Sequence, residues 1–422
     1  MRGRAFVGLC ASCRPAAEAS WRGDAVECQP ELGPEGAAVV IDARSREILA
    51  MVGGYGGGVG FNRATQAIRQ PGSTFKPIAY ALAIQSRKFT PASLVVDAPV
   101  SYDSWKPRNF ETWNYQGALR LRQALAQSVN LVAVRVVESL GPQSVIDFAR
   151  KLGIRTAMDP SLALALGASD VRPVELVNAY ATFAASGEWR ESRLIRQVNR
   201  LDGKKMPLRE TAAPVQVMTP AEAYVISNLM TSVVQEGTGA AAKKLGLALA
   251  GKTGTSNDAR DTWFVGFSPQ VVTGVWVGFD DRRPLGPGES GARTALPIWI
   301  DAMREVHRNR PKEGFAMPSG VNTVGIDPAS GLLAPEGAEH VIQEVFLAGT
   351  EPTEFATPAN VADSSTFLME QMGEGEEGGS YEEGGGEPKA VPDKAPAPAA
   401  KAPAEKAAPA PAPAPAPAPS AP

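Results

Sequence analysis

The strongest constraint on the fold is that strand-like segments lie at both ends of the apolar part of the chain, with helical patterns between them. Two short apolar segments, 37–41 and 47–52, flank a turn at the start. Near the end, three more follow one another through short turns, at 245–251, 262–267 and 271–279. Helical periodicity occupies the intervening segments 75–85, 120–140, 143–152, 173–186 and 221–235. Strands joined by short turns pair antiparallel, so the sequence predicts an α+β fold with an antiparallel β-sheet flanked by helices.

Composition divides the 422 residues into three zones. Residues 1–35 form an irregular leader, residues 36–355 hold nearly all the large apolar side chains, and residues 356–422 form a tail. The tail contains a Glu/Gly run at 373–387 and a Pro-Ala stretch at 408–419. Because it offers so little apolar surface to offset its ordering entropy, we expect the tail to be disordered.

Charge and residue usage exclude several classes of function. The net charge is −3, and residues 370–422 hold nine acidic residues against four lysines, so no basic stripe predicts a nucleic-acid partner. The only histidines are His307 and His340, which leaves almost no material for a Ser-His-Asp triad or a histidine-rich metal site. The three cysteines all lie in the leader, at Cys10, Cys13 and Cys28. Their C-x-x-C spacing could form half a zinc site or a redox pair, but without further ligands we predict no cysteine site.

The leader gives little information about location. No apolar run approaches the ~18 residues of a membrane helix. The segment 5–11 is a short apolar stretch after two arginines, at the lower limit of a signal peptide.

The first motif with chemical meaning is Ser73-Thr-Phe-Lys76, followed by Pro77. Proline is tolerated in the first turn of a helix, so Pro77 predicts a helix that begins near Ser73 or Thr74. Lys76 then projects from the same helix face as Ser73 and can reach its hydroxyl. A lysine whose pKa is lowered by burial or by a nearby cation can serve as the base that activates a serine. Alone, this spacing more often marks a helix N-terminus with an ordinary surface lysine.

Two further motifs follow in order. Ser128-Val-Asn130 lies inside an apolar helical stretch, and Lys252-Thr253-Gly254-Thr255 ends a predicted strand. Separately they could be a polar patch on a half-buried helix and an ordinary strand end. The three patterns S-x-x-K, S-x-N and K-T-G each occur once and in this order, which favours a single catalytic site.

The chain resembles the transpeptidase domain of penicillin-binding proteins, and more closely that of the bifunctional class A enzymes. The three motifs carry this resemblance, together with further stretches that begin at Phe61, Trp105, Asp261 and Gly349. The resemblance spans about residues 36–355 and implies a fold like that of serine β-lactamases, with a helical subdomain beside the sheet.

The resemblance also implies roles for individual residues. Ser73 would attack the penultimate D-Ala of a peptidoglycan stem peptide, and Lys76 would take its proton. Ser128 would relay a proton to the departing amine. Asn130 would bind the substrate amide, and Lys252, Thr253, Gly254 and Thr255 would form the carboxylate-binding strand. β-Lactam antibiotics would acylate Ser73. No cofactor or metal is implied, because lysines and backbone dipoles supply the positive charge.

The resemblance leaves alternatives open. Class A enzymes begin with a membrane helix and a glycosyltransferase domain, which precede the region of resemblance. We therefore expect a truncated product or a separate glycosyltransferase partner, acting in the periplasm or on the extracytoplasmic face of the inner membrane. A D,D-carboxypeptidase, a β-lactamase-like hydrolase and a non-catalytic β-lactam sensor remain alternatives. Near the motifs, Asp258 and Asp261 are both expected to pair with Arg260, and Trp105 and Tyr115 either line a cleft or pack.

Overall fold

The computed structural model describes residues 33–54, 60–103, 105–110, 115–207 and 212–357. The three cysteines, nearly all of the predicted leader and nearly all of the predicted tail lie outside the described residues. All three sequence motifs lie within the described ranges.

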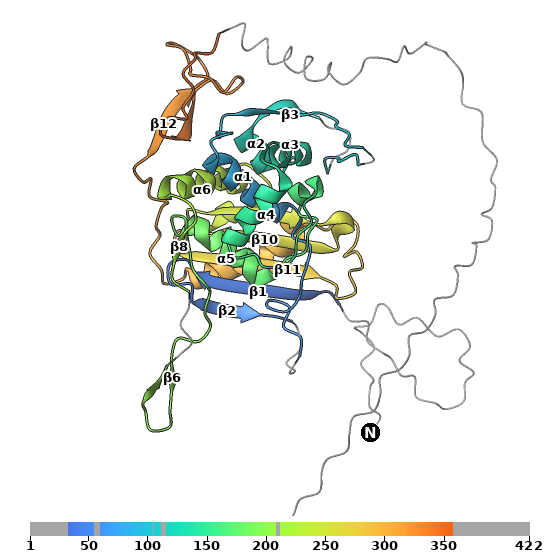
Figure 1. The fold of residues 1–422 in the computed structure, drawn as a ribbon, viewed down its shortest axis with the longest axis vertical. Helices are drawn as coiled ribbons and strands as arrows, with labels where there is room; N and C mark the ends of the chain where they lie inside the picture. The colour runs from blue at the N-terminus through green and yellow to red at the C-terminus, as the bar shows by residue number, and fades with distance from the viewer. Residues whose placement is uncertain (1–32, 55–59, 104, 111–114, 208–211, 358–422) are drawn as a thin grey trace, which may run out of the picture. The chain divides into compact units, whose positions relative to one another are not determined.

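A five-stranded antiparallel sheet forms the centre of the domain and confirms the predicted fold class. Its strand order is β2-β1-β11-β10-β9. The strands are β1 (Glu35–Asp42), β2 (Ile48–Val52), β9 (Ala250–Thr255), β10 (Asp261–Phe267) and β11 (Val271–Gly278). The first strand lies beside the last, from Glu35 opposite Gly278 to Asp42 opposite Val271. The sheet therefore joins the two ends of the domain, as Figure 1 shows in blue and orange-yellow.

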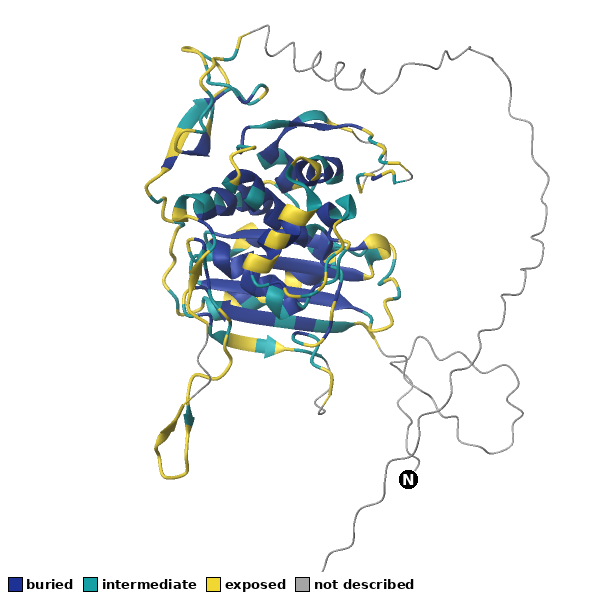
Figure 2. Ribbon diagram, viewed as in Figure 1, coloured by how far each residue is buried: buried dark blue, intermediate teal, exposed yellow. Residues whose placement is uncertain are grey.

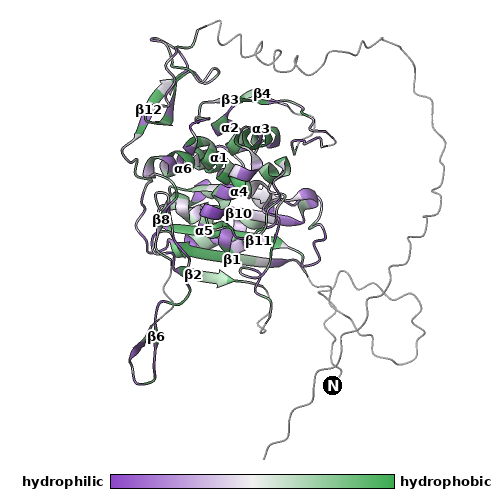
Figure 3. Cartoon of the chain, in the orientation of Figure 1, coloured by the Kyte–Doolittle hydropathy of each residue, from purple (hydrophilic) through white to green (hydrophobic). Residues whose placement is uncertain are grey.

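Alternating side chains of the sheet bury its two faces against different helices. In β10, Trp263, Val265 and Phe267 join the core that contains α5 (Pro173–Ala184), whereas Phe264 points to the opposite core. Trp299 of α7 (Leu296–Val306) packs on that second face, with its ring centroid 4.8 Å from Phe264. The burial of β10 and β11 along their whole length results from this two-sided cover (Figure 2). Figure 3 shows the same apolar character along β1.

The remaining helices stack over one face and form the helical subdomain (Figure 1). They are α1 (Lys76–Gln85), α2 (Leu121–Gln127), α3 (Asn130–Leu140), α4 (Pro142–Lys151) and α6 (Pro220–Gln235). The prediction of one helix over 120–140 is wrong, because Ser128 has φ 62° and ψ 35° and ends α2. A residue in this left-handed region cannot continue an α-helix, so a new helix begins at Asn130.

Short helical turns connect these elements. They are η1 (Gly72–Phe75), η2 (Leu162–Leu166), η3 (Ala240–Leu245), η4 (Asn257–Ala259) and the π-turn η5 (Gly291–Ala295). The predicted strand 245–251 is misplaced: η3 ends at Leu245 with Gly246 as its C-cap, and β9 begins only at Ala250. The K-T-G motif consequently lies within a strand and does not follow one.

Four two-stranded pairs complete the described structure. They are β3 (Leu94–Asp97) with β4 (Gly117–Arg120), β5 (Glu188–Trp189) with β8 (Val215–Gln216), β6 (Val198–Asn199) with β7 (Lys205–Met206), and β12 (Val321–Ile326) with β13 (Ile342–Leu347). The last pair is fastened to the helices by Glu344, which is 1% exposed and accepts a hydrogen bond from Arg122 Nε at 2.7 Å. Over the described ranges, no helix has the length and apolar character needed to cross a bilayer.

Candidate active site

Ser73 lies in a tight turn that leads directly into α1. The turn η1 runs from Gly72 to Phe75, and the α-helix proper begins at Lys76, with Pro77 in its first turn as the sequence predicts. Thr74 and Phe75 are fully buried, while Ser73 is partly exposed. The turn therefore presents Ser73 to solvent on a rigid, buried base.

Glycines bring this turn into backbone contact with its neighbours. A Cβ on Gly72, whose φ is +53°, would lie 2.6 Å from the carbonyl oxygen of Thr255. On the other side, a Cβ on Gly167 would lie 2.1 Å from the carbonyl oxygen of Gly72. Within β9, a Cβ on Gly254 would lie 2.5 Å from the carbonyl oxygen of Pro71. Only hydrogen fits at these points, so the first motif and the K-T-G strand lie against each other.

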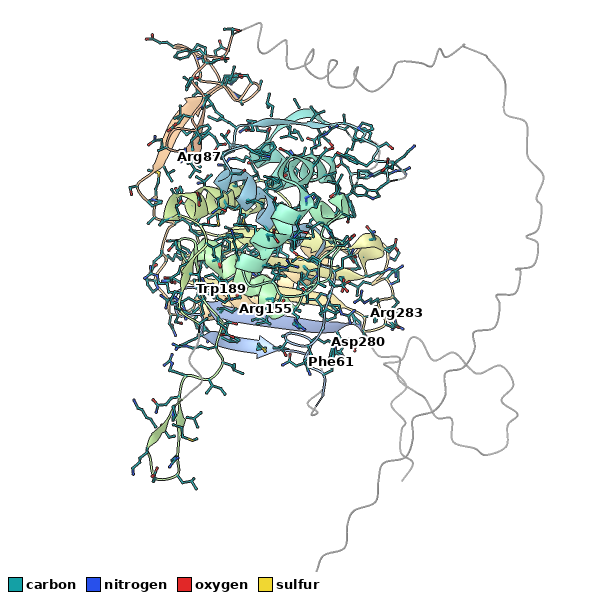
Figure 4. All side chains as sticks on the ribbon, in the orientation of Figure 1. Phe61, Arg87, Arg155, Trp189, Asp280 and Arg283 are labelled. Carbon is teal, nitrogen blue, oxygen red and sulfur yellow. The ribbon has the colours of Figure 1, made fainter. Side chains whose placement is uncertain are left out.

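The segment that precedes Ser73 is anchored to the sheet. Trp263 Nε1 donates to the carbonyl oxygen of Gln70 at 2.8 Å, and Arg69 stacks over the Trp276 ring at 4.7 Å. Arg69 also forms ion pairs with Asp261 at 3.9 Å and with Asp280 at 3.2 Å. Figure 4 marks Asp280 and Phe61 at the same edge of the molecule, where this segment meets the end of β11.

The expectation for Arg260 is half correct: Asp258 pairs with it at 3.1 Å, but Asp261 turns inward to Arg69.

Below Ser73, a buried hydroxyl from α5 holds the turn. Tyr180 of α5 donates to the carbonyl oxygen of Thr74 at 2.6 Å, and both residues are fully buried. This bond satisfies a carbonyl that has no helical partner in the short turn. The contact ties the residue that follows Ser73 to the helix lying on the sheet.

Lys76 is fully buried and meets the loop between α2 and α3. Its Nζ donates to the carbonyl oxygen of Ser128 at 2.7 Å and to Asn130 Oδ1 at 2.7 Å. Longer contacts of 3.3 Å join Nζ to Ser128 Oγ and to the Val129 carbonyl oxygen. Ser73 Oγ is not among these partners of Lys76 Nζ. The first and second motifs nevertheless meet at one amine.

The left-handed conformation of Ser128 explains this meeting. By breaking the helix, it frees the carbonyl groups of residues 128 and 129 from the helical ladder and lets both face Lys76. A continuous helix would have directed those oxygens along its own axis. No local signal marks the break, because Ser128 and Val129 are neither glycine nor proline.

The third motif supplies a second buried amine. Lys252 is fully buried and its Nζ donates to the Thr253 carbonyl oxygen at 3.2 Å. The Thr253 hydroxyl lies 2.7 Å from the hydroxyl of Thr238, which comes from the loop after α6. Thr255 Oγ1 accepts from the Gly291 N–H at 3.1 Å. Thr238 and Gly291 are contacts of the site that sequence reasoning missed, since neither belongs to one of the three motifs.

Burial controls the charge state of both lysines. It lowers the pKa of Lys76 well below its usual value, and the positive charge of Lys252 lowers it further. Burial lowers the pKa of Lys252 to about 7. Two amines that lose protons readily, close to a serine at a helix start, are the groups that acyl transfer through a serine requires.

Of the two aromatic candidates, Trp105 stacks on Tyr102 with ring centroids 6.1 Å apart, while Tyr115 is 39% exposed.

The described residues form no group of three or more His, Cys, Asp or Glu side chains that could hold a metal ion.

An α+β domain with these three motifs around one site is the arrangement of the penicillin-binding transpeptidase fold. Comparison with known proteins gives the family: residues 36–279 match the penicillin-binding protein transpeptidase domain, and residues 317–358 match the C-terminal domain of penicillin-binding protein 1A. The chain belongs to the penicillin-binding protein transpeptidase family.

Individual relatives agree with this assignment. The chain is 40% identical to penicillin-binding protein 1A of Neisseria lactamica over 68% of this chain and 38% of that protein. It is 39% identical to the protein of the same name from Aquifex aeolicus over 78% of this chain and 46% of the other. The chain thus spans less than half the length of these curated relatives.

Solved structures show the same fold. The crystal structure of penicillin-binding protein 1A from Haemophilus influenzae matches with a TM-score of 0.72 at 31% identity, over 77% of this chain and 55% of the other. The Mycobacterium tuberculosis protein PonA1 in complex with penicillin V matches with a TM-score of 0.61 at 26% identity, over 68% of this chain and 82% of the other.

Proposed function

We propose that this chain cross-links peptidoglycan as a D,D-transpeptidase, through an acyl-enzyme on Ser73, and that β-lactams acylate the same serine. The observation that carries the proposal is the meeting of all three motifs at one place. Lys76 contacts Ser128 and Asn130, while the turn of Ser73 lies against Thr255. The family assignment supports the same chemistry.

In the first step, Ser73 Oγ attacks the carbonyl carbon of the penultimate D-Ala of a stem peptide. Lys76 accepts the hydroxyl proton, for which its lowered pKa is suited. The C–N bond to the terminal D-Ala then breaks. Ser128, whose Oγ lies 3.3 Å from Lys76 Nζ, returns a proton to the leaving amine. An acyl-enzyme and free D-Ala result.

Charge that develops on the carbonyl oxygen requires donors fixed in advance. The backbone N–H groups of Ser73 and Thr255 serve as these donors in our proposal, because Gly72 packs closely on Thr255 and brings the backbone of η1 next to that of β9. Lys252, Thr253, Gly254 and Thr255 bind the terminal carboxylate, and Asn130 binds the substrate amide. In the second step, an amine of a neighbouring stem attacks the ester and releases Ser73.

The substrate sets the expected location and partner. A cell-wall substrate requires the periplasm or the extracytoplasmic face of the inner membrane. Because transpeptidation joins newly polymerised strands, we propose a glycosyltransferase activity, in the same or another chain, as the functional partner. We propose residues 36–355 as the catalytic unit and residues 356–422 as a spacer.

Covalent labelling with a fluorescent penicillin tests the nucleophile. We expect a band on a denaturing gel for the native chain and none for Ser73→Ala. As a matched control, Ser45→Ala removes a hydroxyl bonded to Asp42 at 3.0 Å in the turn between β1 and β2, and labelling should persist. Absence of a band from folded native protein would overturn the proposal.

A synthetic stem peptide, with and without an added amine, tests the acceptor. We expect a cross-linked product in addition to free D-Ala when the amine is present. Release of D-Ala with no cross-linked product would instead indicate a carboxypeptidase. Stable penicillin labelling with no peptide turnover would indicate a β-lactam sensor.

A further inference from the structure

The helix that begins at Asn130 is capped by a residue from a distant part of the chain. Its own N-cap residue, Val129, has no side chain that could accept a hydrogen bond. Asn109 Oδ1 supplies the acceptor, taking the N–H of Asn130 at 3.0 Å and the N–H of Leu131 at 3.4 Å. The start of α3 is therefore fixed by the segment before β4 and not by its own sequence.

The Asn109 amide is in turn held by a buried carboxylate. Asp97, at the end of β3, is fully buried, and its Oδ1 accepts from Asn109 Nδ2 at 2.7 Å. Asp97 Oδ2 accepts from the N–H of Gln116 at 3.0 Å. The NH₂ end of the Asn109 amide therefore faces Asp97. The oxygen of Asn109 is thereby directed toward the helix.

The adjacent residue orients the Asn130 side chain. Asn130 Nδ2 donates to the carbonyl oxygen of Arg108 at 2.8 Å, which leaves Oδ1 to accept from Lys76 Nζ at 2.7 Å. Residues 108 and 109 thus hold both the backbone and the amide of Asn130. Each donor and acceptor in this chain of contacts, from Asp97 to Lys76, has a partner of the opposite kind.

We propose that Asp97 and Asn109 are positioning residues for acyl transfer, which hold the Asn130 amide in the orientation that meets the Lys76 amine. The inference rests on the proposed function and deepens it, since nothing in the three motifs includes these two residues. Neither is proposed to touch the substrate. Their effect reaches the reaction through the placement of Asn130 and of the Lys76 Nζ.

The test measures the rate of acylation by a fluorescent penicillin in the full chain as a function of pH. For Asn109→Ala we expect a fall on the order of 10²-fold, the usual effect of misplacing a catalytic group by about 1 Å. The acidic limb of the profile should also move to lower pH, because Lys76 loses an acceptor that favours its charged form. The charge that acts on Lys76 is that of Lys252, which is unchanged in this variant.

An exchange of the two side chains provides the rescue. In the double variant Asp97→Asn with Asn109→Asp, the new amide at 97 can accept from the Gln116 N–H and donate to the new carboxylate at 109. That carboxylate can still accept from the start of α3. We expect the double variant to recover most of the rate, whereas Asn109→Asp alone, which places two carboxylates together, should remain slow.

Thr219→Ala is the matched control for lost capping. Thr219 caps α6 through the N–H of Glu222 at 3.2 Å, so its removal should lower the melting temperature and leave the acylation profile unchanged. The inference is overturned if Asn109→Ala keeps the native rate and profile, or if the folded double variant fails to regain activity. Should Asn109→Ala not fold, Asn109→Asp replaces it in the comparison. Failure of the native chain to label would instead refute the proposed function.

Discussion

Gly72 and Thr255 approach so closely that a Cβ on the glycine would lie 2.6 Å from the threonine carbonyl oxygen. One residue precedes the proposed nucleophile and the other ends the K-T-G motif, although 183 positions separate them in the numbering. This contact joins η1 to β9. The two proposed oxyanion donors depend on it for their spacing.

We therefore expect Gly72→Ala to reduce penicillin acylation by roughly 10²–10³-fold, the effect of losing an oxyanion donor. The added methyl would push η1 from β9 and separate the two N–H groups. Gly246→Ala is the matched control, because Gly246 has a similar φ of +60° but room for a Cβ, whose nearest atom would be Lys312 Nζ at an ordinary contact distance of 3.6 Å. Both variants bear the same backbone strain, so equal acylation rates would show that the contact with Thr255 does not matter.

Two buried tyrosines allow the same substitution to be compared with and without a hydrogen bond. Tyr180→Phe leaves the Thr74 carbonyl oxygen without its partner and should lower the free energy of unfolding by about 1–2 kcal/mol. Tyr80 is equally buried, and its hydroxyl has no hydrogen-bond partner among the described residues. Tyr80→Phe should therefore be neutral or stabilising. Urea unfolding of both variants checks this, and equal losses would argue against a role for the Thr74 bond.

The buried amine of Lys252 makes stability depend on pH. Because its folded pKa is about 7, the folded state binds fewer protons than the unfolded state between about pH 7 and the ordinary lysine pKa of ~10.4. Stability should rise with pH across this window and level off at its lower value below about pH 7, where the amine is charged in both states.

Replacement of the amine should remove that dependence. We expect Lys252→Met to raise the free energy of unfolding by about 1–2 kcal/mol at pH 7, with the gain shrinking toward pH 10. The same variant should acylate slowly, and the acidic limb of its residual rate should move to higher pH, since Lys76 is freed from a neighbouring positive charge. A stability difference that is constant with pH would contradict this account.

The contact between Glu344 and Arg122 should matter more than surface ion pairs do. Glu344 is almost fully buried, and Arg122 also donates to the Asn228 carbonyl oxygen at 2.9 Å. Glu344→Gln leaves the guanidinium without its charge partner and should cost about 3 kcal/mol in unfolding free energy. Asp301→Asn, which breaks an exposed pair with Arg304 on α7, should cost less than about 0.5 kcal/mol. Comparable losses in the two variants would contradict the prediction.

The parts of the fold that depend on local pattern were predictable. Short apolar segments bounded by turns located β1, β10 and β11, and Pro77 placed a helix start near Ser73 or Thr74, which lie in the turn η1 just before α1. The left-handed Ser128 was not predictable, because the residue that contacts its freed carbonyl oxygen, Lys76, lies 52 positions earlier in the chain. In the same way, Asn109 reads as part of a loop, and only the folded chain shows that it caps a helix. Local sequence carries the motifs, whereas the contacts that orient them are long-range.

The pairing of β1 with β11 has a consequence for how the chain is made. Glu35 finds its neighbour Gly278 only after nearly the whole domain has left the ribosome, and β9 and β10 complete the sheet from the same late segment. Contacts of such sequence separation form slowly. Ser73 is synthesised early but gains its contact with Thr255 late, so we expect the proposed reactivity toward penicillin to appear only in the last stage of folding. The appearance of penicillin labelling can thus report when this domain has completed its folding.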